Sequence, residues 1–442
     1  MPWVWKLARR AVRTFYRIER VGGPLPAGPL LLVANHPNTL VDPALIHATA
    51  GCSLRFLAKS TLFAGHPLSW VIRGSGAIPV YRPIDPGVDT SRNVEMFAAV
   101  KAALAAGEAI CLFPEGISHS EGRLEPLRTG AARMALSSAA DGHPVTIVPV
   151  GLNFEHVASF RSRVAVVFGR PFTTDDLAEA FAADEQTAVR RLTDRIERRL
   201  RRLMVEAEPR HDLPIVMRID HLYSAARGVS RDPRELVARR RVIASGMAQL
   251  RERAPERLAE ITAGVAEYDA SLARFGLRDR DIDRRIPFRA AARFAIREGL
   301  LALVLVPLAL LSLAFFVIPY QLTALVSRFA PDYKSRGIWS VCAGTVAYGG
   351  WTGAIAGAVA WRTDAVSGLL AGGAVVALAF GGVAAIERER AVLRTARAFF
   401  ALRQTPLGAR ARLRRQRAAL ADVLDQVQDW LQAGAATPPR RD

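Results

Sequence analysis

A histidine and an aspartate stand six positions apart in the segment VANHPNTLVDP, directly after an apolar run typical of a buried strand. Imidazole titrates near neutral pH, so His36 can accept the proton of a hydroxyl group. A carboxylate on the other ring nitrogen, here Asp42, would fix the required tautomer. Pro37 favours an extended backbone at the histidine, so the pair must meet across a turn. The alternative is that the aspartate only caps a helix over residues 43–50, because Asp before Pro is a typical start of a helix.

Two further segments end apolar runs with groups that bind anions or hydroxyls. GAIPVYR ends at Arg82, whose guanidinium can hold a phosphate with two parallel hydrogen bonds. LFPEGISHS places Glu115 in a turn, where it could hold substrate hydroxyls, fix an arginine such as Arg82, or be an ordinary turn carboxylate. His119 is either a second base or a surface histidine. Taken singly, a surface arginine at a strand end explains Arg82 better than a phosphate site does.

Apolar runs bounded by turn-forming residues precede these groups, and such runs predict strands buried on both faces of a sheet. Helical segments are expected between them, at residues 93–106 and 129–139. This alternation favours an α/β domain with a largely parallel sheet and helices on both faces. Such sheets bind ligands at the carboxyl edge of their strands. The predicted strands cover residues 29–34, 77–81, 109–113, 146–152 and 164–168.

The composition combines a charged part of the chain with an apolar part. The formal net charge is +19 and 23% of the residues are charged, yet half are hydrophobic, and the mean hydropathy is +0.14. Residues 300–318, 338–361 and 365–386 are uncharged, long enough to cross a bilayer, and lack the polar face of a soluble helix. Glycines four residues apart in the last two stretches favour close helix contact in lipid. The sequence therefore predicts an integral membrane protein.

Five regions follow from this pattern. They are a basic amphipathic helix over residues 1–23, a catalytic domain over 24–172, a charged helical extension over 173–296, a membrane segment of two or three helices over 297–387, and a basic tail over 388–442. The first helix either lies in the membrane interface or packs on the domain. We expect an inner (cytoplasmic) membrane protein. The positive-inside rule predicts a cytosolic catalytic domain, a first apolar stretch that is re-entrant or lies in the membrane plane, and a hairpin formed by the last two stretches. Three crossings are the alternative.

The cysteines and the basic charge argue against several classes of protein. Cys52, Cys111 and Cys342 form neither a metal-binding pair nor a disulfide framework, which predicts no metal site and a reducing environment. The charge accompanies no zinc-finger, RNP-like or zipper pattern, so nucleic acid is not an expected partner. The sequence also lacks GxSxG, Walker and HExxH segments, which argues against serine hydrolases, NTPases and zincins.

In order, spacing and strand context, the chemical segments within Val33–Gly151 resemble the glycerophosphate/lysophosphatidate acyltransferase superfamily, over about a third of the chain. Five residues rather than the usual four separate His36 from Asp42, and ISH replaces the usual threonine–arginine–serine after FPEG. Both departures, together with Lys59-Ser60 and the PLRTG run at 126–130, are similar to the branch that contains fungal glycerol-3-phosphate/dihydroxyacetone-phosphate acyltransferases and their bacterial relatives.

The resemblance implies a reaction and its partners. A fatty acyl group would pass from the thioester of acyl-CoA or acyl carrier protein to the hydroxyl of glycerol-3-phosphate or dihydroxyacetone phosphate, in phospholipid biosynthesis. The transfer would take one step, with no covalent enzyme intermediate and no cofactor besides the thioester co-substrate. Membrane lipids, the donor and the acceptor are the implied partners, and no oligomeric state is implied.

The resemblance also implies roles for individual residues. His36 would deprotonate the acceptor hydroxyl, and Asp42 would orient His36. Arg82 would hold the acceptor phosphate and Glu115 its polar groups. The arginine usually found after FPEG is missing, so Arg128 or Lys59 would supply the second phosphate contact. The substrate-binding residues implied besides Arg82 and Glu115 are Lys59, Gly116, Ser118 and Arg128.

Three other functions compete with this one. The first is acylation of 1-acylglycerol-3-phosphate or another lysophospholipid by the same chemistry. The second is a non-catalytic membrane scaffold with a basic lipid-binding tail, against which the intact His36, Asp42 and Glu115 argue. The third is a membrane-tethered nucleic-acid binder, which would require binding that weakens steeply with salt.

Overall fold

The computed structural model divides the chain into two compact units. One comprises Met1–Leu213, Asp232–Ala244 and Ala330–Val341, and the other comprises Pro214–Arg231, Ser245–Phe329 and Cys342–Asp442. The structure describes residues 2–63, 69–85, 87–118, 123–206, 212–229, 232–284, 287–330 and 335–433.

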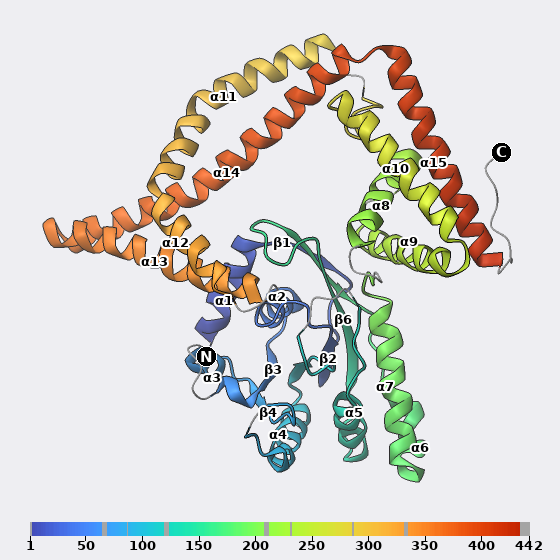
Figure 1. Cartoon of the computed structure of the whole chain (residues 1–442). Helices are drawn as coiled ribbons and strands as arrows, with labels where there is room; N and C mark the ends of the chain where they lie inside the picture. Colours follow the sequence, from blue (N-terminus) through green and yellow to red (C-terminus); the bar gives the residue numbers. More distant parts are fainter. Residues whose placement is uncertain are drawn as a thin grey trace. The chain divides into compact units, whose positions relative to one another are not determined.

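A seven-stranded sheet forms the centre of the first unit in the described part of the chain (Figure 1). The strands are β1 (Arg17–Val21), β2 (Leu30–Ala34), β3 (Leu54–Lys59), β4 (Ile78–Val80), β5 (Ala109–Leu112), β6 (Thr146–Phe154) and β7 (Arg163–Phe168). Their order is β1-β7-β6-β2-β5-β3-β4, and each neighbouring pair is parallel except β6 with β7. The expected largely parallel sheet is confirmed.

Five of the strands were predicted from apolar runs, and two were not. In β1, the charged side chains of RIERV are exposed and only Val21 is buried, as is common at a sheet edge. The strand β3 alternates buried and half-buried residues, and Arg55 interrupts its apolar character. Neither strand contains the continuous apolar run by which the central strands were recognised.

Helices cover both faces of the sheet, because successive side chains of a strand point to opposite faces (Figure 1). The helices of this unit are α1 (Pro2–Phe15), α2 (Val41–Ala50), α3 (Ser69–Gly74), α4 (Asn93–Ala105), α5 (Gly130–Ala140), α6 (Ala178–Ala183) and α7 (Glu185–Arg201). Leu31 and Val33 of β2 belong to the core under α4, α5 and α7. Leu30 and Leu32 belong to the core under α1 and α2.

The first unit extends beyond the boundary expected at residue 172. Leu192, Ile196 and Leu200 of α7 are fully buried in the same core as the sheet. The described residues of α7 therefore belong to the first unit. The charged residues of this segment occupy the outer face of an amphipathic helix, which is why the segment resembled a separate extension.

The basic helix expected over residues 1–23 ends at Phe15, because β1 then joins the sheet beside β7. One side of α1 packs on α2, where the rings of Trp5 and His47 stack with centroids 4.1 Å apart. The packing expected of a helix on the domain is therefore present. The Trp3 side chain is 45% exposed on the same helix, and a position in the membrane interface stays a prediction.

The rest of the described chain is helical. The remaining helices are α8 (Leu213–Arg227), α9 (Pro233–Arg253), α10 (Pro255–Arg274), α11 (Phe288–Phe315), α12 (Val317–Arg328), α13 (Arg336–Arg362), α14 (Ala365–Gln404) and α15 (Leu407–Ala433). The helices α8, α9 and α10 lie within the stretch 173–296, for which a helical extension was expected. Most of the basic tail also proves helical, since α14 continues to Gln404 and α15 follows it.

Two described helices are long and apolar enough to cross a membrane. They lie at Arg289–Phe315 and Ala365–Gln404, and their most apolar windows have mean hydropathies of 2.3 and 2.2 and are only 11% and 17% buried. These apolar, largely exposed helices indicate that the chain associates with a membrane. The third expected stretch, 338–361, is not among them, because its many glycines and its Thr, Tyr and Trp residues contribute little hydropathy.

Within the second unit, small residues let the long helices approach closely. A Cβ atom at Gly382 of α14 would lie 2.0 Å from the hydroxyl oxygen of Ser312 on α11. A Cβ at Gly368 would lie 2.6 Å from Cβ of Ala360 on α13. The predicted close contact is therefore found at Gly368 and at Gly372, where a Cβ would lie 3.3 Å from Cβ of Ala356. It is not found at Gly349, Gly353 and Gly357 of α13, where a Cβ would meet no atom within 4 Å.

Candidate active site

His36 lies at the carboxyl edge of the sheet, in the loop between β2 and α2. The side chain of Asn35, only 4% exposed, ties this loop to β6. Its amide donates to the carbonyl of Leu152 at 3.1 Å and accepts from the amide of Leu152 at 2.7 Å. The loop thus begins from a fixed point on the neighbouring strand.

The imidazole of His36 and the carboxylate of Asp42 are in direct contact. Nδ1 lies 2.8 Å from Oδ2, with the aspartate fully buried and the histidine side chain 19% exposed. The same Oδ2 accepts the backbone N–H of Asn38 at 2.7 Å. Helix α2 begins at Val41 with Leu40 as its N-cap, so the interpretation of Asp42 as a mere helix cap is wrong. A carboxylate on Nδ1 assigns the proton to that nitrogen and leaves Nε2 as the acceptor.

The environment of Asp42 makes its charge costly. Burial raises the pKa of this carboxyl above its ordinary value, while the hydrogen bond from His36, its positive charge and the Asn38 amide act in the opposite direction. Among the described residues, the second oxygen, Oδ1, is buried without a hydrogen-bond partner. A carboxylate of this kind attracts an imidazolium strongly, because little water screens the interaction.

Two residues of the β5 end hold His36 from the other side. The ring of Phe113 stacks on the imidazole with centroids 3.9 Å apart and an interplanar angle of 12°. The backbone N–H of His36 donates to Oε1 of Glu115 at 3.0 Å. Ring, backbone and Nδ1 of the histidine are therefore each fixed by a different group.

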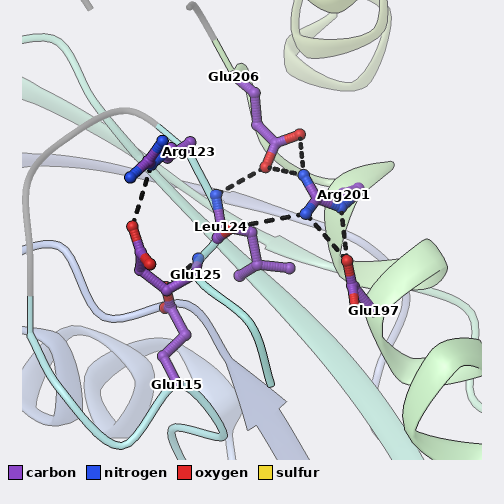
Figure 2. A network of polar contacts seen from close by, with 7 residues as sticks. All are labelled: Glu115, Arg123, Leu124, Glu125, Glu197, Arg201 and Glu206. Atoms are coloured by element: carbon purple, nitrogen blue, oxygen red, sulfur yellow. Dashed lines mark hydrogen bonds and ion pairs between the residues drawn. The ribbon is translucent and has the colours of Figure 1, made fainter.

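Glu115 joins the histidine loop to a polar network that reaches the end of α7 (Figure 2). It is 3% exposed, and its Oε2 accepts the N–H of Glu125 at 2.9 Å. The preceding residue, Leu124, donates its N–H to Glu206 at 2.7 Å, and Arg201 of α7 binds the same carboxylate at 2.8 Å. Both oxygens of Glu115 thus accept backbone amides.

Arg82 pairs with Asp85 and not with Glu115, so the alternative that Glu115 fixes this arginine is wrong. Its Nε and Nη2 donate to the two oxygens of Asp85 at 2.8 and 2.6 Å, and its Nη1 donates to the carbonyl of Gly116 at 2.7 Å. The hydrogen bond from Arg82, with smaller contributions from its charge and that of Lys59, lowers the pKa of Asp85. Lys59 itself is exposed at the end of β3.

The turn after Phe113 collects the remaining candidates. Gly116 has a φ of +71°, which favours glycine, and a Cβ there would lie 2.6 Å from Nε of Arg128. The hydroxyl of Ser118 accepts the N–H of Thr39 from the histidine loop at 3.0 Å. His119, the possible second base, lies outside the described residues. Chain segments far apart in sequence therefore meet at Gly116.

Sequence reasoning missed three groups of this site. Asn38 is fully buried, and its amide donates to the hydroxyl of Tyr16 at 2.9 Å and the carbonyl of Val157 at 3.2 Å. The hydroxyl of Tyr16 donates to the same carbonyl. The signal for Asn38 was its place inside the histidine segment. Asp85 could have been found from its spacing of three residues from Arg82, whereas nothing local marks Tyr16.

Comparison with known proteins agrees with this arrangement. Residues 16–153, which include the histidine loop and the turn at Gly116, match the family model described as Acyltransferase. The resemblance to the glycerophosphate/lysophosphatidate acyltransferase superfamily is thereby confirmed.

Three curated relatives share this part of the chain. Glycerol-3-phosphate O-acyltransferase 1 of Saccharomyces cerevisiae is 32% identical over 203 residues, 45% of this chain and 26% of the yeast protein. Glycerol-3-phosphate O-acyltransferase 2 of the same yeast is 27% identical over 193 residues, 43% of this chain and 26% of its own length. A chloroplastic 1-acyl-sn-glycerol-3-phosphate acyltransferase of Brassica napus is 26% identical over 144 residues, 32% of this chain and 40% of the plant protein. The chain thus spans about a quarter of the length of the yeast relatives.

Proposed function

We propose that this chain is a membrane-bound O-acyltransferase that acylates a hydroxyl of glycerol-3-phosphate or dihydroxyacetone phosphate, with acyl-CoA or acyl-acyl carrier protein as donor. The observation that carries the proposal is the 2.8 Å contact between Nδ1 of His36 and Oδ2 of Asp42. Arginine side chains at the same edge of the sheet supply the positive charge that a phosphorylated acceptor needs. The relatives named for glycerol-3-phosphate support this acceptor.

The proposed reaction is a single displacement. Nε2 of His36 takes the proton of the acceptor hydroxyl while the oxygen attacks the thioester carbonyl carbon. The new C–O bond forms, the C–S bond breaks, and the thiolate leaves with the proton returned by the imidazolium. Asp42 stays ionised, holds Nδ1–H and stabilises the transient positive charge of the ring.

The arginines and Lys59 form the proposed acceptor site. Arg82 is held by Asp85 and Gly116, so its charge is fixed in place but partly neutralised. Arg128 and Lys59 are exposed and able to move onto a phosphate. We therefore assign the direct phosphate contacts to Arg128 and Lys59. Arg82 contributes through the N–H groups that do not bind Asp85 or Gly116.

Glu115, Gly116 and Ser118 have a different part in this proposal. Glu115 positions the histidine, because its two oxygens already accept the amides of His36 and Glu125. Gly116 lets the Arg128 side chain cross the turn at close range. The Ser118 oxygen accepts from Thr39, which leaves its own proton available to an acceptor oxygen.

The membrane location is part of the same proposal. We infer that α11 and α14 hold the chain in the cytoplasmic membrane, because both are apolar enough to cross it. The basic residues that flank these helices favour a cytosolic catalytic domain. Membrane lipids would then surround the site at which the acylated product is released.

An acyl-transfer assay tests the function. Detergent-solubilised full-length protein is given labelled palmitoyl-CoA with glycerol-3-phosphate, dihydroxyacetone phosphate or lysophosphatidate in parallel, and the His36→Ala protein is the control. Product from either of the first two acceptors, absent with the variant, supports the proposal. Product from lysophosphatidate alone would leave the proposed mechanism unchanged. The acceptor would then be 1-acylglycerol-3-phosphate, the substrate in the name of the Brassica relative. Absence of product with both palmitoyl-CoA and palmitoyl-acyl carrier protein would refute the activity.

A further inference from the structure

A basic groove lies on the first unit, between α1, β1 and the end of α2. Its volume is about 940 Å³, within the range of small-molecule sites. Tyr16, which binds Asn38 of the histidine loop, lines it, but no residue to which a step of acyl transfer is assigned does. The arginines that line it are Arg9, Arg13, Arg17, Arg20 and Arg161.

The lining of this basic groove contains no aspartate or glutamate among the described residues. Nε of Arg20 donates to the carbonyl of Thr49 at 2.8 Å, and Nη2 of Arg13 donates to that of Ala48 at 3.2 Å. Nη1 and Nη2 of Arg20 also donate to the carbonyls of Gly22 and Gly23 at 2.6 and 2.7 Å. These carbonyls hold the two guanidinium groups in place but are neutral acceptors. A cluster of guanidinium groups around a hollow favours an anion with several acceptor oxygens.

Exposed aromatic side chains occur on the segments that carry these arginines. Trp3 of α1 is 45% exposed and stacks on Trp70, which is 54% exposed, with centroids 5.6 Å apart. Phe160, next to Arg161 in sequence, is 53% exposed. Aromatic rings and arginines together are typical of protein surfaces at the boundary between lipid and water. This neighbourhood distinguishes a lipid headgroup from a free phosphate as the source of the anion.

We propose that the basic groove binds the phosphate of an anionic phospholipid headgroup and so holds the first unit at an anionic bilayer surface. The exposed aromatic side chains enter the interface around the bound lipid. This site is separate from the acceptor site and takes no part in acyl transfer.

Calorimetric titration of the full-length protein in a neutral detergent tests this site without any turnover. The ligands are dihexanoylphosphatidylglycerol, dihexanoylphosphatidylcholine and inorganic phosphate. We expect saturable binding of the anionic lipid, with the other two ligands roughly tenfold weaker or more. Equal binding of phosphatidylcholine would show that the headgroup charge is not recognised, and equal binding of phosphate would identify a free-anion site. Either result overturns the proposal.

Matched variants locate the binding. Arg9→Gln/Arg13→Gln should weaken binding of the anionic lipid roughly tenfold or more. The control Arg190→Gln/Arg191→Gln removes the same charge from the exposed face of α7 and should leave binding within about twofold. If the first pair lowers the unfolding temperature, Arg9→Gln alone replaces it.

A third variant separates this site from the acceptor site. Lys59→Gln/Arg128→Gln removes the two exposed charges proposed to bind the acceptor phosphate. The proposal is supported if lipid binding is kept in Lys59→Gln/Arg128→Gln and lost in Arg9→Gln/Arg13→Gln. Lipid binding that is lost with Lys59→Gln/Arg128→Gln and kept with Arg9→Gln/Arg13→Gln would place the lipid in the acceptor site and overturn it.

Discussion

The two ends of the candidate site are built in opposite ways. At the proton-transfer end, Asp42 and Glu115 are buried, and backbone amides bind their oxygens and so fix the position of His36. At the anion end, Arg82 is half-buried and pairs with a side chain, and Arg128 is exposed. A base must be placed to within a few tenths of an ångström, whereas long cations can move onto a phosphate. The difference indicates a rigid catalytic end and an adaptable binding end.

Removal of the base should have the largest effect. We expect His36→Ala to lower kcat roughly 10²–10⁴-fold, the usual contribution of a general base. His156, an exposed histidine of the same unit, supplies the matched control, and His156→Ala should keep wild-type kcat. A His36→Ala protein that is folded by circular dichroism and still turns over at the wild-type rate would contradict the assignment of the base.

Neutralisation of the buried carboxylate should come next. Asp42→Asn keeps the shape but loses the charge that orients and stabilises the imidazolium, so kcat should fall about 10²-fold or more. Burial raises the pKa of Asp42, so the ionised form is disfavoured in the folded state and costs stability above the unfolded pKa. The variant should therefore unfold at the same temperature as wild type or higher at pH 7. A less stable but active variant would show a structural role only.

A change at the anion end should affect binding more than catalysis. Arg82→Ala should raise KM for the phosphorylated acceptor about 10- to 100-fold, because a charge-assisted hydrogen bond is lost and Asp85 is left unpaired near the phosphate. The double variant Arg82→Ala/Asp85→Ala should recover part of this loss. A larger effect on KM for the thioester than for the acceptor would remove Arg82 from the acceptor site.

The smallest effect is expected from His47, which lies outside both ends of the candidate site. It concerns the stability of the fold at acidic pH. Burial, with a smaller contribution from the charge of Arg9, lowers the pKa of His47 to about 4. The folded protein therefore binds this proton more weakly than the unfolded chain, so stability is complete above about pH 6.5 and falls as the pH approaches 4.

Chemical denaturation of the His47→Phe variant measures this contribution. Phenylalanine keeps a ring against Trp5, and the variant should lose about 2 kcal/mol less of its unfolding free energy between pH 7 and pH 5 than wild type. Activity at pH 7 should stay unchanged. If the unfolding free energies of the two proteins depend on pH in the same way, His47 is not the source of the loss of stability at acidic pH.

The sequence alone was sufficient to predict the features that depend on residues close together along the chain. The apolar runs of β2, β5 and β6 need burial on both faces of a sheet, so these strands could be predicted from the sequence. Pro37 favours an extended backbone at His36, so a contact with Asp42 six residues later was expected across a turn. The apolar character of α11 and α14 likewise follows from composition alone.

Tertiary structure decided what depends on segments that are distant in sequence. The sequence predicted Glu115 as a site residue, but its partners are amides of two other loops. Tyr16 reaches the site only because β1 pairs with β7, and α7 belongs to the core only because the sheet offers it an apolar face. Hydrophobic periodicity records which face of an element is buried but not which element covers it. The choice among partners is made by packing the whole unit, where each contact is possible only after the others have formed.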